Sequence, residues 1–322
     1  MTKKEGKKNY NGKESTDRVK EITEKLEQGI QDLFDSDKYR LYLNTMSKLH
    51  HYSYSNSLLI MLQKPDATMV AGYTKWRDTF KRYVKAGEKA IKIIAPAPYK
   101  RKMLVEKIDP VTRKVVVGND GQPVMIEKEI SVPSYRIVSV YDVSQTDGQE
   151  IPSIISELEE RVEQYDDFMD ALVSVSPVPI DFEDIEGKAH GYYHLEEKRI
   201  AIDQGMSESQ TIKTCIHEIA HAKMHAITDS QEKRIDRSTQ EVQAESVAYT
   251  VCQHFGVDTS EYTFGYVAGW SSGRQLAELK TSLAVIQKTA DELITGIESY
   301  LDGKMIQRKA QSQNLWDLGF LT

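Results

Sequence analysis

Two histidines four residues apart, His217 and His221, form the pair whose spacing points most directly to chemistry. Residues four apart on an α-helix project from the same face, so both imidazoles can turn a nitrogen toward one ion about 2 Å away. Glu218 lies beside such an ion without binding it. In a metal hydrolase, a carboxylate in this place accepts a proton from a water molecule that the ion has activated. The run from His217 to His221 therefore predicts a catalytic-type site with Zn²⁺ as cofactor.

The residues around this motif favour the helix that it needs. A Ser207 or Ser209 start precedes the motif, and isoleucines at 212, 216 and 219 give the helix an apolar opposite face. The short apolar run 200–202 before it predicts a strand. The sequence therefore places both histidines on a helix that packs against a sheet.

The third ligand is expected from a second helix. Glu241 and Glu245 lie one helical turn apart, about twenty residues after His221, and one of them should bind the ion. His225 is excluded, because on one continuous helix it lies about 12 Å along the axis from His217. Two alternatives stay open: incidental histidines on a surface helix, and a metal that serves no peptidase activity.

The charge distribution divides the chain. Lys and Arg exceed Asp and Glu by eight in residues 1–149, whereas the acids exceed the bases by fifteen in residues 150–322, for a net charge of −7. The sign changes in a polar segment, 144–152, that contains glycine and proline. We predict a disordered basic tail at 1–15, a first domain at 16–148 and a second domain at 149–322.

Mixed helical and strand patterns predict an α+β fold for the chain, with an α+β first domain. The first domain should have a helix that begins near Ser15 and Thr16, a helix over 41–60, strands near 68–70 and 91–94, a hairpin of 111–117 with 124–130 around the turn 118–121, and a strand at 135–141. The second should have a helix over 153–173, a strand near 178–182, a strand pair within 191–202, and mostly helix to about residue 301.

Composition excludes several classes of protein. The two cysteines, Cys215 and Cys252, are too few for a disulfide framework. No apolar run reaches the roughly 18 residues that cross a bilayer, and the start lacks the apolar core of a signal peptide. The sequence therefore predicts a cytoplasmic protein without a membrane partner.

Residues 75–107 are rich in bases and aromatic side chains. Phosphates attract cations, and unpaired bases stack on flat rings, so this mixture favours single-stranded DNA over duplex. The alternative is a solvated basic face with aromatic residues in the core. The predicted DNA-binding residues are Tyr73, Lys75, Trp76, Lys81, Arg82, Lys85, Lys89 and Lys92.

The chain resembles the ArdC anti-restriction family over about residues 18–300. The resemblance rests on segments at 56–60, 72–76, 83–89, 135–146 and 266–270, and departs from the family at Ala86 and in a longer hairpin at 100–130. It implies a single-stranded-DNA-binding domain followed by a gluzincin-like metallopeptidase domain. In gluzincins the first acid of the second helix binds zinc and the second orients a ligand histidine. The resemblance therefore implies Glu241 as the ligand and Glu245 as the residue that orients His217 or His221, with exchangeable roles.

These observations predict a cytoplasmic protein of a mobile element that binds single-stranded DNA, carries zinc and protects incoming DNA from restriction. It is a candidate zinc metallopeptidase with an unknown protein substrate. The alternatives are a non-catalytic DNA-shielding protein with structural zinc, and a regulatory metalloprotease that cleaves a repressor. The stabiliser of the oxyanion is open among His190, His194, Tyr249 and Tyr266.

Overall fold

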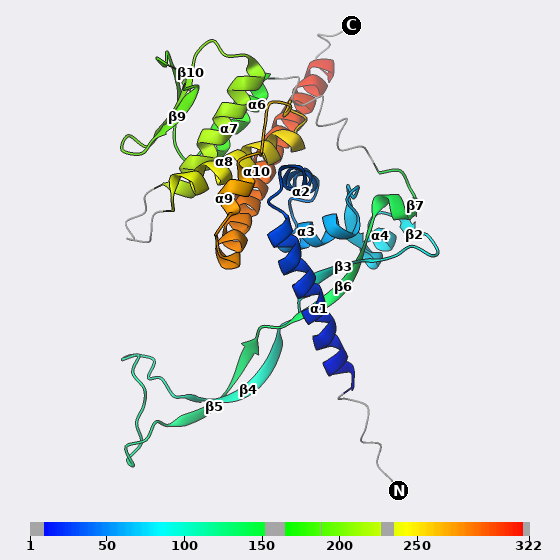
Figure 1. Ribbon diagram of the computed structural model, residues 1–322, viewed down its shortest axis with the longest axis vertical. Coiled ribbons are helices and arrows are strands. Elements are labelled where there is room, and N and C mark those ends of the chain that lie inside the picture. Colours follow the sequence, from blue (N-terminus) through cyan, green and yellow to red (C-terminus); the bar gives the residue numbers. More distant parts are fainter. Residues whose placement is uncertain (1–9, 152–164, 188, 227–234, 318–322) are drawn as a thin grey trace. The chain divides into compact units, whose positions relative to one another are not determined.

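The computed structural model describes residues 10–151, 165–187, 189–226 and 235–317, with the backbone alone at 10–17 and 309–317 (Figure 1). The chain forms two compact units: a hairpin unit (residues up to 24 with 92–139) and a main unit (residues 25–91 with 140 onward). The predicted domain division at residues 148 and 149 remains a prediction. Most of the predicted tail and the first part of the predicted helix 153–173 lie outside the described residues.

Helices make up most of the described chain. They are α1 (Tyr10–Asp32), α2 (Ser36–Lys48), α3 (Tyr54–Gln63), α4 (Tyr73–Asp78), α6 (Tyr165–Val175), α7 (Glu208–His225), α8 (Arg237–His254), α9 (Val267–Ser271) and α10 (Leu276–Asp317), with a 3-10 turn η1 at Val143–Gln145.

The strands form small sheets. They are β1 (Val70–Gly72), β2 (Arg82–Val84), β3 (Ile91–Pro96), β4 (Tyr99–Glu106), β5 (Met125–Val132), β6 (Tyr135–Asp142), β7 (Thr146–Gly148), β8 (Ile180–Glu183), β9 (Gly191–His194) and β10 (Arg199–Asp203). The sheet orders are β1-β6-β3, β8-β10-β9, β2-β7 and β4-β5. The predicted α+β fold is therefore confirmed.

The first helices differ in their ends from the prediction. Helix α1 begins at Tyr10, so the predicted cap at Ser15 and Thr16 is wrong and both residues lie inside the helix. The helix predicted over 41–60 is two helices, because α2 ends at Lys48 and α3 restarts after Ser53, whose side chain accepts from the Asn56 N–H.

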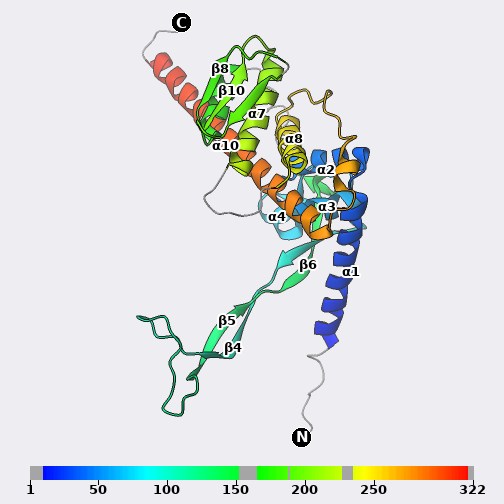
Figure 2. The ribbon, with the colours of Figure 1, turned by 60° about the vertical axis from the view of Figure 1, so that its left-hand side comes forward.

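The hairpin unit contains a long two-stranded ribbon, which Figures 1 and 2 show as β4 beside β5. Its register runs from Tyr99 opposite Val132 to Glu106 opposite Met125. The predicted turn at 118–121 is present, because the Gly121 N–H donates to the Gly118 carbonyl. The predicted partner strand 111–117 is wrong: β5 pairs with β4, and 111–117 contributes only isolated bridges.

In the main unit, helices α2, α8 and α10 pack around a common core. Helix α8 contacts α2, α7 and α10. The Tyr39 hydroxyl of α2 lies 2.8 Å from the Ser246 hydroxyl of α8, and both residues are buried. Packing against three other helices therefore fixes the position of α8. No helix in the described part of the chain combines the length and apolarity needed to cross a membrane.

Candidate metal centre

Helix α7 carries the histidine pair and begins where the sequence indicates. The Ser207 side chain accepts from the Gln210 N–H, and Ile212, Ile216 and Ile219 are buried. The helix packs against β9 and β10. A Cβ atom at Gly191 of β9 would lie 2.6 Å from the Thr214 methyl, so only glycine allows this strand to approach α7 so closely.

Helix α8 is fixed at its first turn, just before Glu241. Asp236 caps the helix by accepting from the Thr239 N–H. The same carboxylate accepts from the Arg274 guanidinium at 3.0 Å, and the Trp270 indole N–H donates to the Thr239 hydroxyl at 3.0 Å. These contacts limit the freedom of the turn that positions Glu241.

Three ligand-type atoms from the two helices converge. His217 Nε2 lies 3.1 Å from His221 Nε2, and Glu241 Oε2 lies 3.7 and 3.6 Å from these two nitrogens. Ligands of a tetrahedral zinc ion, bound at about 2.0–2.1 Å, lie about 3.3 Å apart. The donor set and its spacing therefore fit a divalent cation with one position left open.

A hydrogen-bonded chain behind His221 fixes its tautomer. The His225 Nε2 lies 3.0 Å from Gln243 Oε1, so this nitrogen donates, and His225 Nδ1 can then accept from His221 Nδ1 at 2.9 Å. Gln243 in turn donates to the Ser282 hydroxyl. His221 Nε2 is left with a lone pair directed at the site, as a metal ligand requires.

Sequence reasoning assigned no role to His225 beyond excluding it as a ligand. Its Nε2 contacts Gln243 of the neighbouring helix and does not join the three converging ligand-type atoms. The available signal was the four-residue step from His221 to His225, which places the two rings on one face.

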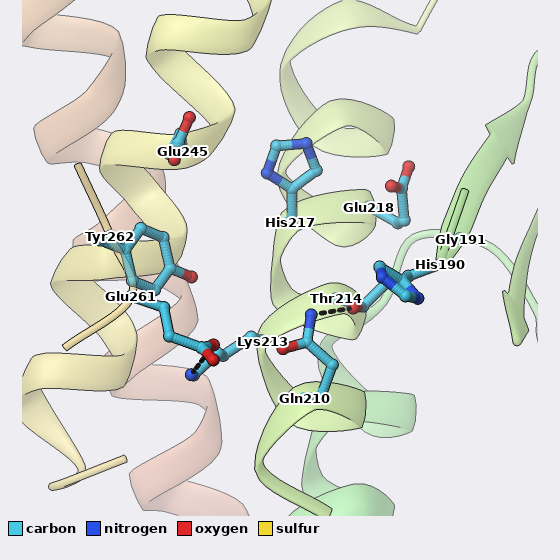
Figure 3. Close-up of a pocket in the computed structure, with 10 residues that line it drawn as sticks. All are labelled: His190, Gly191, Gln210, Lys213, Thr214, His217, Glu218, Glu245, Glu261 and Tyr262. Atoms are coloured by element: carbon cyan, nitrogen blue, oxygen red, sulfur yellow. Dashed lines mark hydrogen bonds and ion pairs between the residues drawn. The ribbon is translucent and has the colours of Figure 1, made fainter. Parts of the chain in front are cut away.

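Glu218 follows His217 on α7 and lines the same pocket. Figure 3 shows Glu218 and Glu245 on opposite sides of His217, and all three side chains line a pocket between α7, α8 and β9. Glu218 is 8% exposed, and burial raises the pKa of its carboxyl group, although His217 and His221 oppose the shift. The neighbouring imidazoles of His217 and His221 lower the pKa of Glu241, which keeps that carboxylate ionised.

Glu245 does not support a ligand histidine in this structure. It accepts from the Tyr266 hydroxyl at 2.8 Å and, among the described residues, makes no hydrogen bond with either histidine. Burial raises the pKa of Glu245. The orienting role implied for Glu245 is taken by His225 at His221.

The four candidate oxyanion stabilisers have different surroundings. His190 lines the pocket, as Tyr262 does, whereas Tyr249 is buried with its ring against Tyr262 and Phe264. The His194 Nδ1 accepts from the Glu197 N–H, and Tyr266 is occupied by Glu245. Lys213, only 7% exposed, lines the same pocket and pairs with Glu261 at 3.0 Å.

The predicted DNA-binding residues are placed unequally. Trp76 has no exposed surface, and its indole N–H donates to the Tyr141 carbonyl at 2.9 Å. The prediction that Trp76 stacks on a base is therefore wrong: it is a core residue. Tyr73 and Tyr83 are exposed instead.

The predicted basic residues are exposed with one exception. Lys75, Lys81, Lys85, Lys89 and Lys92 face solvent, and Arg82 is half-buried. Lys81 donates to the Asp78 carbonyl, Lys85 to the Ser144 carbonyl and Lys92 to the Ser139 hydroxyl.

Arg82 of β2 connects this strand to β7. Its guanidinium donates to the hydroxyl and the carbonyl of Thr146, both at 2.8 Å. Gln145 likewise donates to Glu88 and to the Lys89 carbonyl, which fixes the turn before Lys89. Gly87 in that turn has φ +86, a conformation that favours glycine. Part of the motif at 83–89 therefore serves the fold.

Known proteins match both parts of the chain. Residues 13–141 match the model of the N-terminal domain of anti-restriction factor ArdC, and residues 136–246 match a model described as "Putative metallopeptidase family (DUF6782)". A protein of Bacillus anthracis described as uncharacterized is 27% identical over 325 residues, covering 92% of this chain and 54% of that protein. The chain thus spans about half the length of that curated relative.

Two solved structures match most of the chain. They are crystal structures of the antirestriction protein ArdC from plasmid R388, metal-free with TM-score 0.41 and 18% identity, and Mn(II)-bound with TM-score 0.40 and 17% identity. Each alignment covers 77% of this chain and 83% of the other.

The fold and the matched segments define a class: an α+β protein that joins an ArdC-type N-terminal domain to a metallopeptidase-type domain. The chain is thus ArdC-like over residues 13–141 and similar to a putative metallopeptidase family over residues 136–246.

Proposed function

We propose that the chain is a zinc-dependent hydrolase of the metallopeptidase type that binds single-stranded DNA and protects incoming DNA of a mobile element from restriction. One observation carries the hydrolase part: His217 Nε2, His221 Nε2 and Glu241 Oε2 lie 3.1–3.7 Å apart beside a buried carboxylate. Two imidazoles and one carboxylate at tetrahedral spacing are a donor set of catalytic zinc sites.

The side chains around the proposed ion have separate roles. A bound cation would polarise a substrate carbonyl and lower the pKa of a water molecule. Glu218 would accept that proton and pass it to the leaving amine, since its raised pKa brings it nearer to neutral pH. His225 and Gln243 hold His221 in the tautomer that binds.

The DNA part of the proposal relies on exposed residues of the main unit. Tyr73 and Tyr83 offer flat rings for unpaired bases, and Lys75, Lys85 and Lys89 offer cations for phosphates. We leave Trp76 and Arg82 out of this surface, because Trp76 is buried in the core and the Arg82 guanidinium is hydrogen-bonded to Thr146. Lys81 remains an additional candidate on this unit, and Lys92 is a separate candidate in the hairpin unit.

The experiment that tests the hydrolase part replaces Glu218 with glutamine, which keeps the size of the side chain and removes its basicity. Hydrolysis of a peptide library should fall by about 10²–10⁴-fold, the usual contribution of a general acid–base group. Protection of unmodified DNA transferred into a restricting host should fall to the level of cells without the protein. Bound metal should stay at the wild-type amount.

The matched control is Glu261→Gln, which changes an exposed carboxylate lining the same pocket. It should leave hydrolysis and protection intact. If Glu218→Gln protects as well as the wild type, the hydrolase role is wrong and DNA shielding with a structural metal becomes the better account. Cleavage of a host repressor by the wild type alone would favour the regulatory protease.

A further inference from the structure

A second cluster of histidines and carboxylates lies in the main unit, outside the site on α7. His50 and His51 come from the connection between α2 and α3, His254 is the last residue of α8, and Asp291 and Glu298 belong to α10. The rings of His50 and His254 lie 5.0 Å apart, and those of His50 and His51 3.9 Å apart. Three segments distant in the sequence thus bring metal-binding side chains together.

The proton positions in this cluster are set by its neighbours. His254 Nδ1 lies 2.7 Å from the Ser47 carbonyl, which can only accept, so Nδ1 carries the proton. In the neutral ring Nε2 then carries a lone pair, and this atom lies 3.1 Å from Glu298 Oε1, another acceptor. Two acceptors at this distance need a cation between them or a second proton on the ring.

A hydrogen bond also sets the tautomer of His50. Its Nδ1 lies 2.8 Å from Asp291 Oδ1, so it donates there and leaves Nε2 as the free ligand atom. The Gln287 side chain fixes the backbone by donating to the His50 carbonyl at 2.7 Å. A carboxylate or carbonyl behind each imidazole is the arrangement that orients histidines toward metals.

Burial and spacing also suit a bound ion. The side chains of His50 and His254 are 7% and 9% exposed, and that of Glu298 is 28% exposed. One ligand atom from each of these three residues lies within 4.8 Å of the others. Closing them to the roughly 3.3 Å of a tetrahedral site takes shifts of about 1.5 Å at most.

We propose that His50, His254 and Glu298 form a second divalent-cation site, with Asp291 and the Ser47 carbonyl orienting the two imidazoles. N and O donors suit Zn²⁺ or a similar transition metal. The ion links the connection after α2 to α8 and α10. Because α8 also carries Glu241, this second ion stabilises the helix on which the first site depends.

The test counts metal in metal-free protein titrated with Zn²⁺ alone. The wild type should bind two ions per chain. The Glu241→Gln variant should bind one ion at the second site, and the His254→Gln variant should bind one ion at the α7 site. His254→Gln should lower the Zn²⁺ affinity of the second site by more than about 100-fold, because loss of even an outer-shell partner lowers metal affinity by about 10- to 100-fold. The Glu241→Gln variant should still gain thermal stability on addition of Zn²⁺.

His51→Gln is the matched control. His51 contacts the same Asp291 at 2.9 Å, but its side chain is 69% exposed and it is not a proposed ligand, so this variant should bind two ions. Thermal unfolding of each metal-free variant shows whether it is folded. A folded Glu241→Gln variant that binds no Zn²⁺ overturns the second site, which is then a protonated His254–Glu298 ion pair. A wild type that loses its one ion with His254→Gln but not with Glu241→Gln overturns the α7 site instead.

Discussion

Replacing Glu241 with alanine is expected to lower the affinity of the α7 site for Zn²⁺ by more than about 100-fold. The reason is direct: Glu241 Oε2 lies 3.6–3.7 Å from both histidine nitrogens, and removing a ligand costs more than the 10- to 100-fold lost with outer-shell partners. Calorimetric titration in the His254→Gln background measures this site alone.

Glu245→Ala is the matched control, one helical turn away on the same face of α8. Its carboxylate binds the Tyr266 hydroxyl and neither histidine, so the affinity should change by at most about tenfold. The reverse ranking, with Glu245→Ala the weaker binder, would assign the third ligand to Glu245 and contradict the role of Glu241.

Reversing three charges, Lys75→Glu, Lys85→Glu and Lys89→Glu, should weaken binding to a single-stranded oligonucleotide by on the order of 100-fold at low salt. If each lysine neutralises one phosphate, the slope of log affinity against log salt should become shallower by about 2, since each contact contributes about 0.7 for single strands. Fluorescence anisotropy over a salt series measures both quantities.

A control variant with three reversed charges elsewhere on the chain distinguishes loss of the proposed DNA-binding surface from a general effect of net charge. Lys198, Lys223 and Lys288 are exposed and lie outside residues 73–89, so reversing them should leave most of the affinity. Tyr73→Ala and Tyr83→Ala should each cost about 1–3 kcal/mol, the value of one stacked base. Equal loss in both charge variants, with no loss in the tyrosine variants, would refute the assigned surface.

These binding experiments need the full chain. A fragment lacking residues 150–322 would remove α8 and α10, on which α2 and α3 pack. Such a fragment would expose the core residues Tyr39 and Tyr42, so its failure to bind DNA would say nothing about the surface.

The helix with the histidine pair could be predicted because its signals are local. The Ser207 cap, the isoleucine face and the four-residue histidine step all act within one helix, and the structure places each as expected. The strand pair before it was also predictable, since β9 and β10 are joined by a short turn.

Non-local partners could not be predicted in the same way. The strand that pairs with β5 was misassigned, because 99–106 and 111–117 both have strand-like composition and only the long-range register chooses between them. The role of Trp76 could not be predicted, because its amphipathic ring can either stack on a nucleic-acid base or pack in a protein core, and only the structure shows that it is buried. The second histidine cluster combines residues more than 200 positions apart, so no local spacing indicated it.

In the proposed metal centre, two imidazoles from α7 and one carboxylate from α8 bind the same cation. Anomalous diffraction at the zinc edge, from crystals of the full chain grown with Zn²⁺, tests it most directly. A peak about 2.0–2.2 Å from His217 Nε2, His221 Nε2 and a Glu241 oxygen is the predicted result. Density that shows no peak between these three atoms at saturating Zn²⁺ would contradict it.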